Sequence, residues 1–253
     1  MEREASRLQA ILSAAAEAVL SRDEDAHARA VHGLKVLMDA VLPKHLGLPL
    51  PASSDHTSRS DQPVIRSQIV YECADFELCI FVFPEGARLP LHDHPGMTVL
   101  TKVLYGSLSM RSFDWEQPLE ASELAFLTAE QRRQAQARGS KVSLPTDIAA
   151  EVFGRPLFAR RRVDTVLTPE APTFCLRPSF FNIHSFEALS ACAVLDLILP
   201  PYDDDAGRSC HYFTIADNSD ESRPLLAVAE PEPGSLIIRG APYLGPRLHP
   251  VQT

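Results

Sequence analysis

The sequence predicts a mainly β fold with helices at its N-terminus. Apolar residues recur at helical spacing through residues 1–48, whereas from residue 64 onward short apolar runs are bounded by Gly and Pro, as strands are. A chain of 253 residues with 45% hydrophobic content can bury one substantial core, so no second domain is required. One of the strand-like runs also carries two histidines, which makes it a candidate for a functional site.

Residues 1–48 are predicted to form a helical region that packs on the β domain. A charged stretch at residues 22–25 divides this region into two helices. The apolar positions are Leu8, Ile11, Leu12, Ala15 and Val19 in the first helix, then Val31, Leu34, Leu37, Met38 and Val41 in the second. Residues 49–63 are rich in Pro, Ser and Asp and are predicted to be a linker, and residues 64–253 form the β domain.

His92 and His94 have the spacing of metal ligands. In an extended chain, residues i and i+2 project from the same face, about 6.6 to 7 Å apart along the strand. The two imidazoles can therefore converge on one ion while Asp93 points the other way. The alternative is a half-exposed strand that carries two surface histidines.

The residues around this pair have the spacing of the first cupin motif. Gly86 is followed by five residues, His92-x-His94, four residues, Val99, six residues and Gly106. Gly106 lies between two apolar runs, 98–104 and 108–113, which predicts two strands joined by a tight turn. Many cupins, which are small antiparallel barrels of the double-stranded β-helix or jelly-roll type, carry a glutamate ligand where this chain has Val99. Valine cannot bind a metal, so we expect three protein ligands and open positions.

The third ligand is expected on a later strand, because a barrel brings distant segments together across its interior. Of the remaining histidines, only His184 and His211 lie in strand-like sequence. The others fall in the helical region, the linker or the C-terminus, and they are His27, His32, His45, His56 and His249. The spacing alone leaves both candidates open.

Four separated blocks of this chain resemble the thiol dioxygenase family of cysteamine dioxygenase and the plant cysteine oxidases. The resemblance covers residues 63–245, and its blocks are 69–76, 89–115, 182–184 and 191–213. It implies a cupin barrel over most of the domain 64–253, a monomer, and an Fe(2+) ion held by His92, His94 and His184. It also implies that O2 is a substrate and that both oxygen atoms end on the sulfur of an aminothiol, giving a sulfinic acid.

Three readings of the function remain open. The first is oxidation of an N-terminal cysteine of a protein or peptide to cysteine sulfinic acid, which by resemblance implies oxygen sensing, N-degron signalling and a response to hypoxia. The second is oxidation of a small aminothiol, cysteamine, to hypotaurine. The third, of another class, is a cupin that binds metal without catalysis.

Four further residues are candidates for the site. Asp196 interrupts the apolar run 193–199, where an ionised carboxylate is costly unless it is paired. We expect it to face the cavity and to bind the substrate amine or orient a ligand histidine, the alternative being a bond to a loop amide. Tyr202 aligns with a family tyrosine near the site. The resemblance places Cys210 near the iron. Cys210 could form an oxidative crosslink to Tyr212, and the alternative is that the two side chains only pack together in a strand.

Two departures from the family bear on the substrate. Phe180-Phe181 stand where the family has a glycine pair, so they could narrow the pocket, cover it or change the path of the loop. Residues 116–173 are predicted to be a long loop insertion. It carries a basic run at 160–162 and five further basic residues, Arg132, Arg133, Arg138, Lys141 and Arg155. These residues either belong to a solvated loop or form a nuclear signal or a patch that binds an acidic partner.

The overall charge and composition narrow the partners and the compartment. With 24 basic and 33 acidic residues the net charge is −9, which argues against binding nucleic acid or an anionic membrane surface. No apolar stretch reaches the roughly 18 to 20 residues of a transmembrane helix. Five cysteines do not make a disulfide framework, so we expect reduced thiols. We therefore expect a cytoplasmic location, with the nucleus as the alternative.

Overall fold

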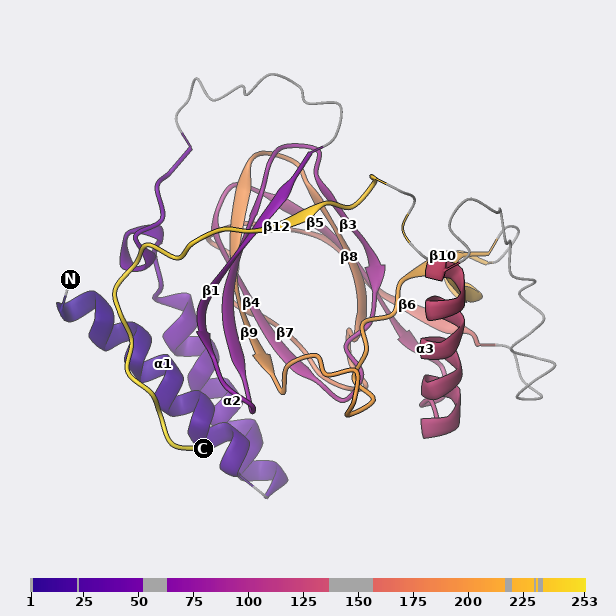
Figure 1. Ribbon diagram of the computed structural model, residues 1–253, viewed down its shortest axis with the longest axis horizontal. Coiled ribbons are helices and arrows are strands. Elements are labelled where there is room, and N and C mark those ends of the chain that lie inside the picture. Colours follow the sequence, from indigo (N-terminus) through magenta and orange to yellow (C-terminus); the bar gives the residue numbers. More distant parts are fainter. Residues whose placement is uncertain are drawn as a thin grey trace.

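The computed structural model is a β-barrel with two helices along one side (Figure 1). It describes residues 2–21, 23–51, 63–136, 157–216, 220–229, 231 and 234–253. Two sheets face one another across the barrel, and the three segments that carry the candidate ligands lie in or beside the smaller of them. The expected mainly β barrel with N-terminal helices is therefore confirmed.

The larger sheet has six strands in the order β12-β1-β2-β9-β4-β7. All neighbours are antiparallel except β1 and β12, which run parallel. Its strands are β1 (Ile65–Glu72), β2 (Glu77–Phe83), β4 (Thr98–Tyr105), β7 (Phe174–Leu176), β9 (Cys192–Leu199) and β12 (Ile238–Gly240). Strand β9 is entirely buried because it pairs with β2 on one edge and β4 on the other.

The smaller sheet has four strands in the order β3-β8-β5-β6, and a separate pair is formed by β10 and β11. These strands are β3 (Arg88–His92), β5 (Leu108–Trp115), β6 (Ala159–Leu167), β8 (Ile183–Ala188), β10 (Phe213–Ile215) and β11 (Leu226–Val228). Within the ladder, His92 lies opposite His184, and His184 lies opposite Ser112. Strand pairing alone thus brings two candidate ligands together from positions far apart in sequence.

Gly106 joins the two sheets. The predicted strands on either side of it are β4 and β5, and each pairs with other strands, β4 in the larger sheet and β5 in the smaller. Gly106 has φ 76°, a left-handed conformation that glycine adopts without strain, and a Cβ there would lie 2.3 Å from the carbonyl oxygen of Ala191. A side chain does not fit at this position, so the chain crosses between sheets on a glycine.

The helices cover the outer face of the larger sheet (Figure 1). They are α1 (Glu2–Leu20), α2 (Glu24–Asp39) and the short 3-10 helix η1 (Pro43–Leu46). Asp23 caps α2 by accepting a hydrogen bond from the Ala26 amide at 2.8 Å. The apolar faces of both helices pack against strand residues such as Leu78 and Leu197. Among the described helices, none combines the length and the apolar character needed to cross a bilayer.

The prediction of a long loop over residues 116–173 was wrong for much of its described part. It contains helix α3 (Ala121–Gln136) and strand β6, which pairs along the length of β5. Strand β6 is a mostly exposed edge strand rich in Arg, so it lacks the apolar alternation by which a strand is recognised from sequence. The basic run 160–162 therefore belongs to a strand, while Arg138, Lys141 and Arg155 lie outside the described residues, as do 52–62 of the expected linker.

Candidate metal centre

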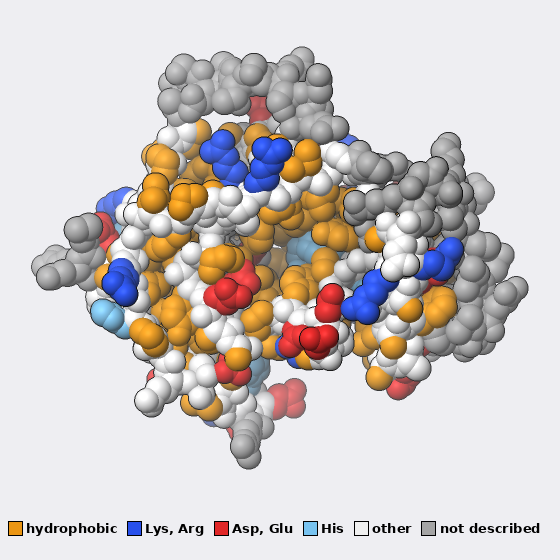
Figure 2. All heavy atoms as spheres, in the orientation of Figure 1, with side chains coloured by type: hydrophobic (Ala, Val, Ile, Leu, Met, Phe, Trp, Pro, Cys, Tyr) orange, Lys and Arg blue, Asp and Glu red, His pale blue; other side chains and the backbone are white. Residues whose placement is uncertain are grey.

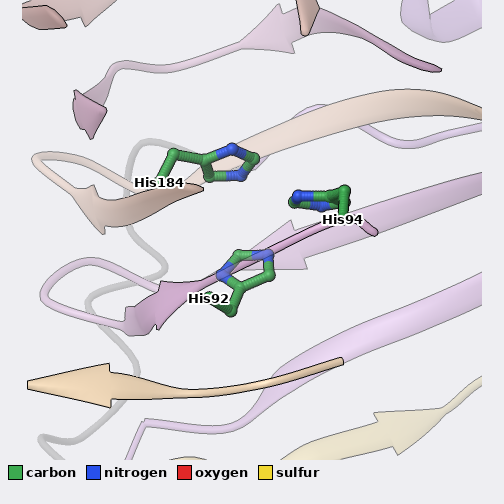
Figure 3. A group of neighbouring side chains, drawn as sticks. All are labelled: His92, His94 and His184. Atoms are coloured by element: carbon green, nitrogen blue, oxygen red, sulfur yellow. The ribbon is translucent and has the colours of Figure 1, made fainter. Parts of the chain in front are cut away.

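His92, His94 and His184 meet at one end of the barrel (Figure 3). His92 ends strand β3, His94 follows in the next loop, and His184 is the second residue of β8. Their ring centroids are 4.7 to 4.8 Å apart, and one nitrogen of each lies within 4.8 Å of the others. His211, the other open candidate from the sequence, is not part of this group.

The three imidazoles are buried and neutral. Burial lowers the pKa of His92, and it lowers the pKa of His94 and His184 well below the usual range, with the neighbouring rings adding to the effect at His94 and His184. Neutral imidazole is the form of histidine that binds metals. The site therefore offers three nitrogen donors without first having to lose protons at neutral pH.

Hydrogen bonds to backbone carbonyls fix two of the rings. Nδ1 of His92 donates to the carbonyl of Pro90 at 2.8 Å, and Nδ1 of His94 donates to the carbonyl of Asn182 at 3.0 Å. Each bond places the proton on Nδ1 and leaves Nε2 with a free lone pair, as in most metal-binding histidines. Nδ1 of His184 is buried and has no hydrogen-bond partner among the described residues. The donor set fits a metal ion of the borderline first-row type.

Asn182 connects the loop that carries His94 to the segment before His184. Its side-chain oxygen accepts from the His94 amide at 3.1 Å, and its side-chain nitrogen donates to the His94 carbonyl at 2.8 Å. Its own amide donates to Asp114 at 3.0 Å, and Asp114 in turn pairs with Arg162 of β6 at 2.7 Å. Sequence reasoning gave Asn182 no role, although an Asn two residues before a ligand is a signal for such a loop contact.

Asp93 turns away from the three rings, as its position between the ligands predicts. Its carboxylate accepts from the amide of His211 at 2.8 Å and from Nδ1 of the same residue at 3.0 Å. Nε2 of His211 lies 2.8 Å from the hydroxyl oxygen of Thr128 in α3. Both Asp93 and His211 are buried. The backbone between His92 and His94 is thus linked to helix α3 through the buried pair of Asp93 and His211.

Tyr202, Cys210 and Tyr212 lie along one side of the centre. The Tyr202 hydroxyl donates to the Asp93 carbonyl at 2.8 Å, and the ring centroids of Tyr202 and His94 are 5.6 Å apart. The Tyr212 ring lies 6.1 Å from that of His92. Burial and the nearby Asp93 raise the pKa of the Cys210 thiol to about 12, whereas hydrogen bonds with the two tyrosines act to lower it.

Cys210 and Tyr212 lie outside the named strands. Strand β10 begins only at Phe213, and Tyr212 makes a single bridge to His92. Helix α3 shapes this segment instead, because Gln131 donates to the Cys210 carbonyl and accepts from the Tyr212 amide, both at 2.8 Å. A side-chain amide of α3 therefore binds the backbone on both sides of His211.

Asp196 lies on the inner face of β9, opposite Cys79 in β2 and Thr101 in β4. Its neighbours Leu195 and Leu197 face the helices, so alternation along the strand directs Asp196 to the barrel interior. Burial raises the pKa of Asp196 to about 7, a hydrogen bond with Thr101 acts to lower it, and Glu77 raises it further. Its Oδ1 atom has no hydrogen-bond partner among the described residues. In the described part of the chain no loop amide binds that oxygen, which leaves it available to a ligand.

Phe181 occupies a conformation that favours glycine. Its φ is 59°, in the left-handed region that residues with a Cβ seldom adopt. The loop before His184 therefore takes a glycine-like path although it carries Phe180-Phe181. The Phe181 ring packs against Phe174 and Phe180, with centroid distances of 5.3 and 4.0 Å, and joins an apolar cluster that includes Tyr202.

The fold and the site together define a β-barrel protein with a three-histidine centre for a metal. A crystal structure of a cupin superfamily protein from Desulfitobacterium hafniense is similar to it at a TM-score of 0.33 and 14% identity, over 60% of this chain and 91% of that one.

The family follows from the sequence comparisons. The PCO_ADO family model matches residues 37–248. Plant cysteine oxidase 2 from Arabidopsis thaliana is 28% identical over 232 residues, 85% of this chain and 72% of that protein. The 2-aminoethanethiol dioxygenase from Homo sapiens is 31% identical over 199 residues, 74% of this chain and 70% of that protein. The chain belongs to the PCO_ADO family of thiol dioxygenases, which are oxidoreductases that use O2.

Proposed function

We propose that this protein is an Fe(II)-dependent dioxygenase that converts the N-terminal cysteine of a protein or peptide to cysteine sulfinic acid. The observation that carries the proposal is the group of three buried, neutral histidines in a thiol dioxygenase chain. No carboxylate belongs to that group within the described part of the chain, because Val99 stands where many cupins have glutamate. An all-imidazole set suits Fe(II) better than Ca or Mg.

His92, His94 and His184 would hold the iron. Bound Fe(II) supplies the redox chemistry that joins both atoms of O2 to the substrate sulfur. The protein's own contribution is to keep the three rings neutral and fixed, by burial and by the carbonyls of Pro90 and Asn182. Three ligands leave positions for a substrate that binds through both its thiol and its amine.

We propose that Asp196 and Tyr202 handle the substrate. The unpartnered oxygen of Asp196 accepts a hydrogen bond or a proton from the substrate amine in the barrel interior. Tyr202 lies beside the His94 ring and, through its hydroxyl, holds the backbone of Asp93. It therefore shapes the wall of the site on the side of Cys210.

An accessible opening supports a peptide substrate. Figure 2 shows a hollow on this face of the barrel, with apolar side chains around it and histidine atoms visible within it. The similarity to proteins named plant cysteine oxidase supports the same substrate, and the similarity to proteins named 2-aminoethanethiol dioxygenase favours cysteamine as the second candidate. If the substrate is an N-terminal cysteine, we propose that its sulfinic acid product acts as an N-degron. The substrate protein would then be marked for degradation when O2 is plentiful, in the cytoplasm or the nucleus.

Cys210 and Tyr212 are proposed to form a thioether during turnover. The new bond joins the sulfur to a ring carbon, and two hydrogens are lost to O2. The support is that the thiol lies within hydrogen-bonding reach of the Tyr212 hydroxyl. Intact-mass spectrometry after aerobic turnover should show a loss of two hydrogens in the wild type and none in Cys210→Ser. An unchanged wild-type mass would leave the pair as ordinary packing.

The function is tested by mass spectrometry of thiols incubated with the Fe(II)-loaded protein in air. A peptide that begins with cysteine should gain two oxygens, and His184→Ala should abolish the gain. His249→Ala is the matched control, since His249 binds Gln9 through its backbone and this variant keeps those bonds. Oxidation of cysteamine alone would move the function to small thiols. No oxidation of either thiol by a protein shown to hold iron would indicate a non-catalytic cupin.

A further inference from the structure

The turn between β7 and β8 leaves the barrel at the end where the three histidines lie. Strand β7 ends at Leu176, which pairs with Val99 near the start of β4. Strand β8 begins at Ile183, which pairs with Phe113 near the end of β5. The turn, residues 177–182, therefore forms one rim of the site, and it is closed by paired bonds between Arg177 and Phe180 of 2.8 and 3.1 Å.

A second rim at this end of the barrel is formed by the segment that follows β9. Leu199 pairs with Thr98, so residues 200–212 leave the barrel at the same end. Tyr202 and Tyr212 of this segment lie beside the rings of His94 and His92. These two segments therefore border the end of the barrel from which a substrate chain would leave the metal centre for solvent.

Phe180 and Phe181 present an aromatic surface on the first rim. The Phe181 ring belongs to the same apolar cluster as Tyr202, whereas Phe180 is 46% exposed although it is a large apolar side chain. The two rings contact one another at 4.0 Å, and the guanidinium of Arg162 lies 5.9 Å from the Phe180 ring. Arg162 also pairs with Asp114, which anchors the turn through the amide of Asn182. The exposed ring is thus held by fixed neighbours.

We infer that Phe180 and Phe181 select the second residue of the substrate, and that they favour an apolar side chain directly after the N-terminal cysteine. This inference rests on the proposed function. The cysteine thiol and amine lie at the three histidines, and an extended chain advances about 3.3 Å per residue, so the next side chain reaches the rim. An apolar side chain there covers the exposed face of Phe180 and is removed from water with it.

The backbone supports a specific role for this pair. Phe181 has a left-handed conformation that glycine would adopt at lower cost, so its packed neighbours hold the side chain against the preference of the backbone. Strained backbone of this kind concentrates at ligand-binding sites. The two rings therefore give this rim a preference for an apolar second residue of the substrate, which a glycine pair in the same loop would lack.

The test compares two peptides that differ only at the second residue, Cys-Phe and Cys-Gly. The wild type should oxidise Cys-Phe with a kcat/KM about five to ten times higher, mostly through KM, because burial of one apolar side chain is worth roughly this factor. Anaerobic calorimetry with the Fe(II)-loaded protein should show the same ratio in Kd without turnover. Phe180→Ala should reduce both ratios to about one, and Phe180→Leu should keep part of them.

Phe158→Ala is the matched control. Phe158 also lies under a guanidinium, with Arg223 at 3.9 Å, but it bridges to Leu225 away from the site rim. It should keep the wild-type ratio. Equal Kd and kcat/KM for the two peptides in a wild type that oxidises both would overturn this inference and leave the proposed function standing. Oxidation of neither peptide would instead overturn the proposed function, and the inference with it.

Discussion

The two sheets of the barrel are buried by different means. The larger sheet turns an apolar face to α1 and α2, where residues such as Leu78, Leu100 and Leu197 are fully buried. The end of the smaller sheet near the histidines is buried together with polar groups, among them Asp93, Asp114, Asn182 and His211. One side of the molecule is therefore held mainly by the hydrophobic effect, whereas the other also depends on hydrogen bonds between buried polar groups.

This difference separates stability from chemistry. A truncated Leu under the helices leaves a cavity but touches no group at the metal centre. A substituted polar residue near the histidines removes little apolar area, yet it frees a ligand ring or a loop. Substitutions in the two regions should therefore change different measured quantities.

The largest effect is expected from removing a ligand on the smaller sheet. His92→Ala should lower turnover at least a thousandfold and abolish tight metal binding, because two imidazoles do not hold the ion. The measurements are metal content after dialysis and initial rate with a Cys peptide. His32→Ala, an exposed histidine in α2, should keep both. Normal iron content in His92→Ala would remove this residue from the centre.

Leu197→Ala tests the other side of the comparison. Leu197 is fully buried in β9 against the helices, so its truncation should lower the free energy of unfolding by about 3 to 5 kcal/mol. The rate per folded molecule should stay within about twofold of the wild type, since Leu197 faces away from the interior. Urea denaturation and activity below the transition measure the two effects, with exposed Leu189→Ala as the control. A large loss of rate in folded protein would contradict the separation.

Asp196 is a polar group inside the apolar sheet, and it should make stability depend on pH. Burial raises the pKa of Asp196 from 3.8 to about 7, so the folded state holds its proton more tightly than the unfolded state. Stability of the metal-free protein should fall as pH rises from about 4 to 7, by roughly 2 to 4 kcal/mol from this group. Asp196→Asn cannot ionise and should lack this part of the fall.

Urea denaturation with chelator at pH 5 and pH 8 measures this effect. The stability difference between Asp196→Asn and the wild type should grow at pH 8, whereas exposed Asp205→Asn should show no such change. A constant difference would mean that Asp196 is ionised in the folded state at both pH values. The same variant should keep iron and lose most turnover if Asp196 receives the substrate amine.

The smallest effect is expected from the loop contact at Asn182. Asn182→Ala removes both side-chain bonds to the His94 backbone and should weaken metal binding about 10- to 100-fold, with little loss of apolar packing. Competition with a chromophoric chelator gives the affinity. Gln9→Ala removes a comparable amide bridge, to His249, and should leave metal affinity unchanged. Equal affinities for the two variants would show that burial alone positions His94.

The fold was predictable wherever one pattern dominated. Helical spacing indicated both N-terminal helices, and the turn at Gly106 indicated β4 and β5. Strand β6 was missed because an exposed edge strand carries arginines in place of an apolar alternation. Its pairing depends on the backbone of β5, which local sequence does not reveal.

The site was predictable in its ligands and less so in their supports. The spacing of His92 and His94 marks them directly, while the choice of His184 over His211 needed the family resemblance. The roles of Asn182, Thr128 and Gln131 depend on contacts between segments far apart in sequence, so no local pattern reports them. The glycine-like backbone of Phe181 runs against residue preference and is visible only in the structure.

The central place of β9 also has a consequence for synthesis of the chain. Its partners β2 and β4 are made first, and β9 follows β2 by roughly 110 residues. At a synthesis rate of about 5 to 20 residues per second, one edge of β2 and one edge of β4 stay unpaired for some 5 to 20 s before β9 is made. Helices α1 and α2 are made before any strand and pack on the same face. They can therefore shelter the nascent strands from aggregation until β9 leaves the ribosome.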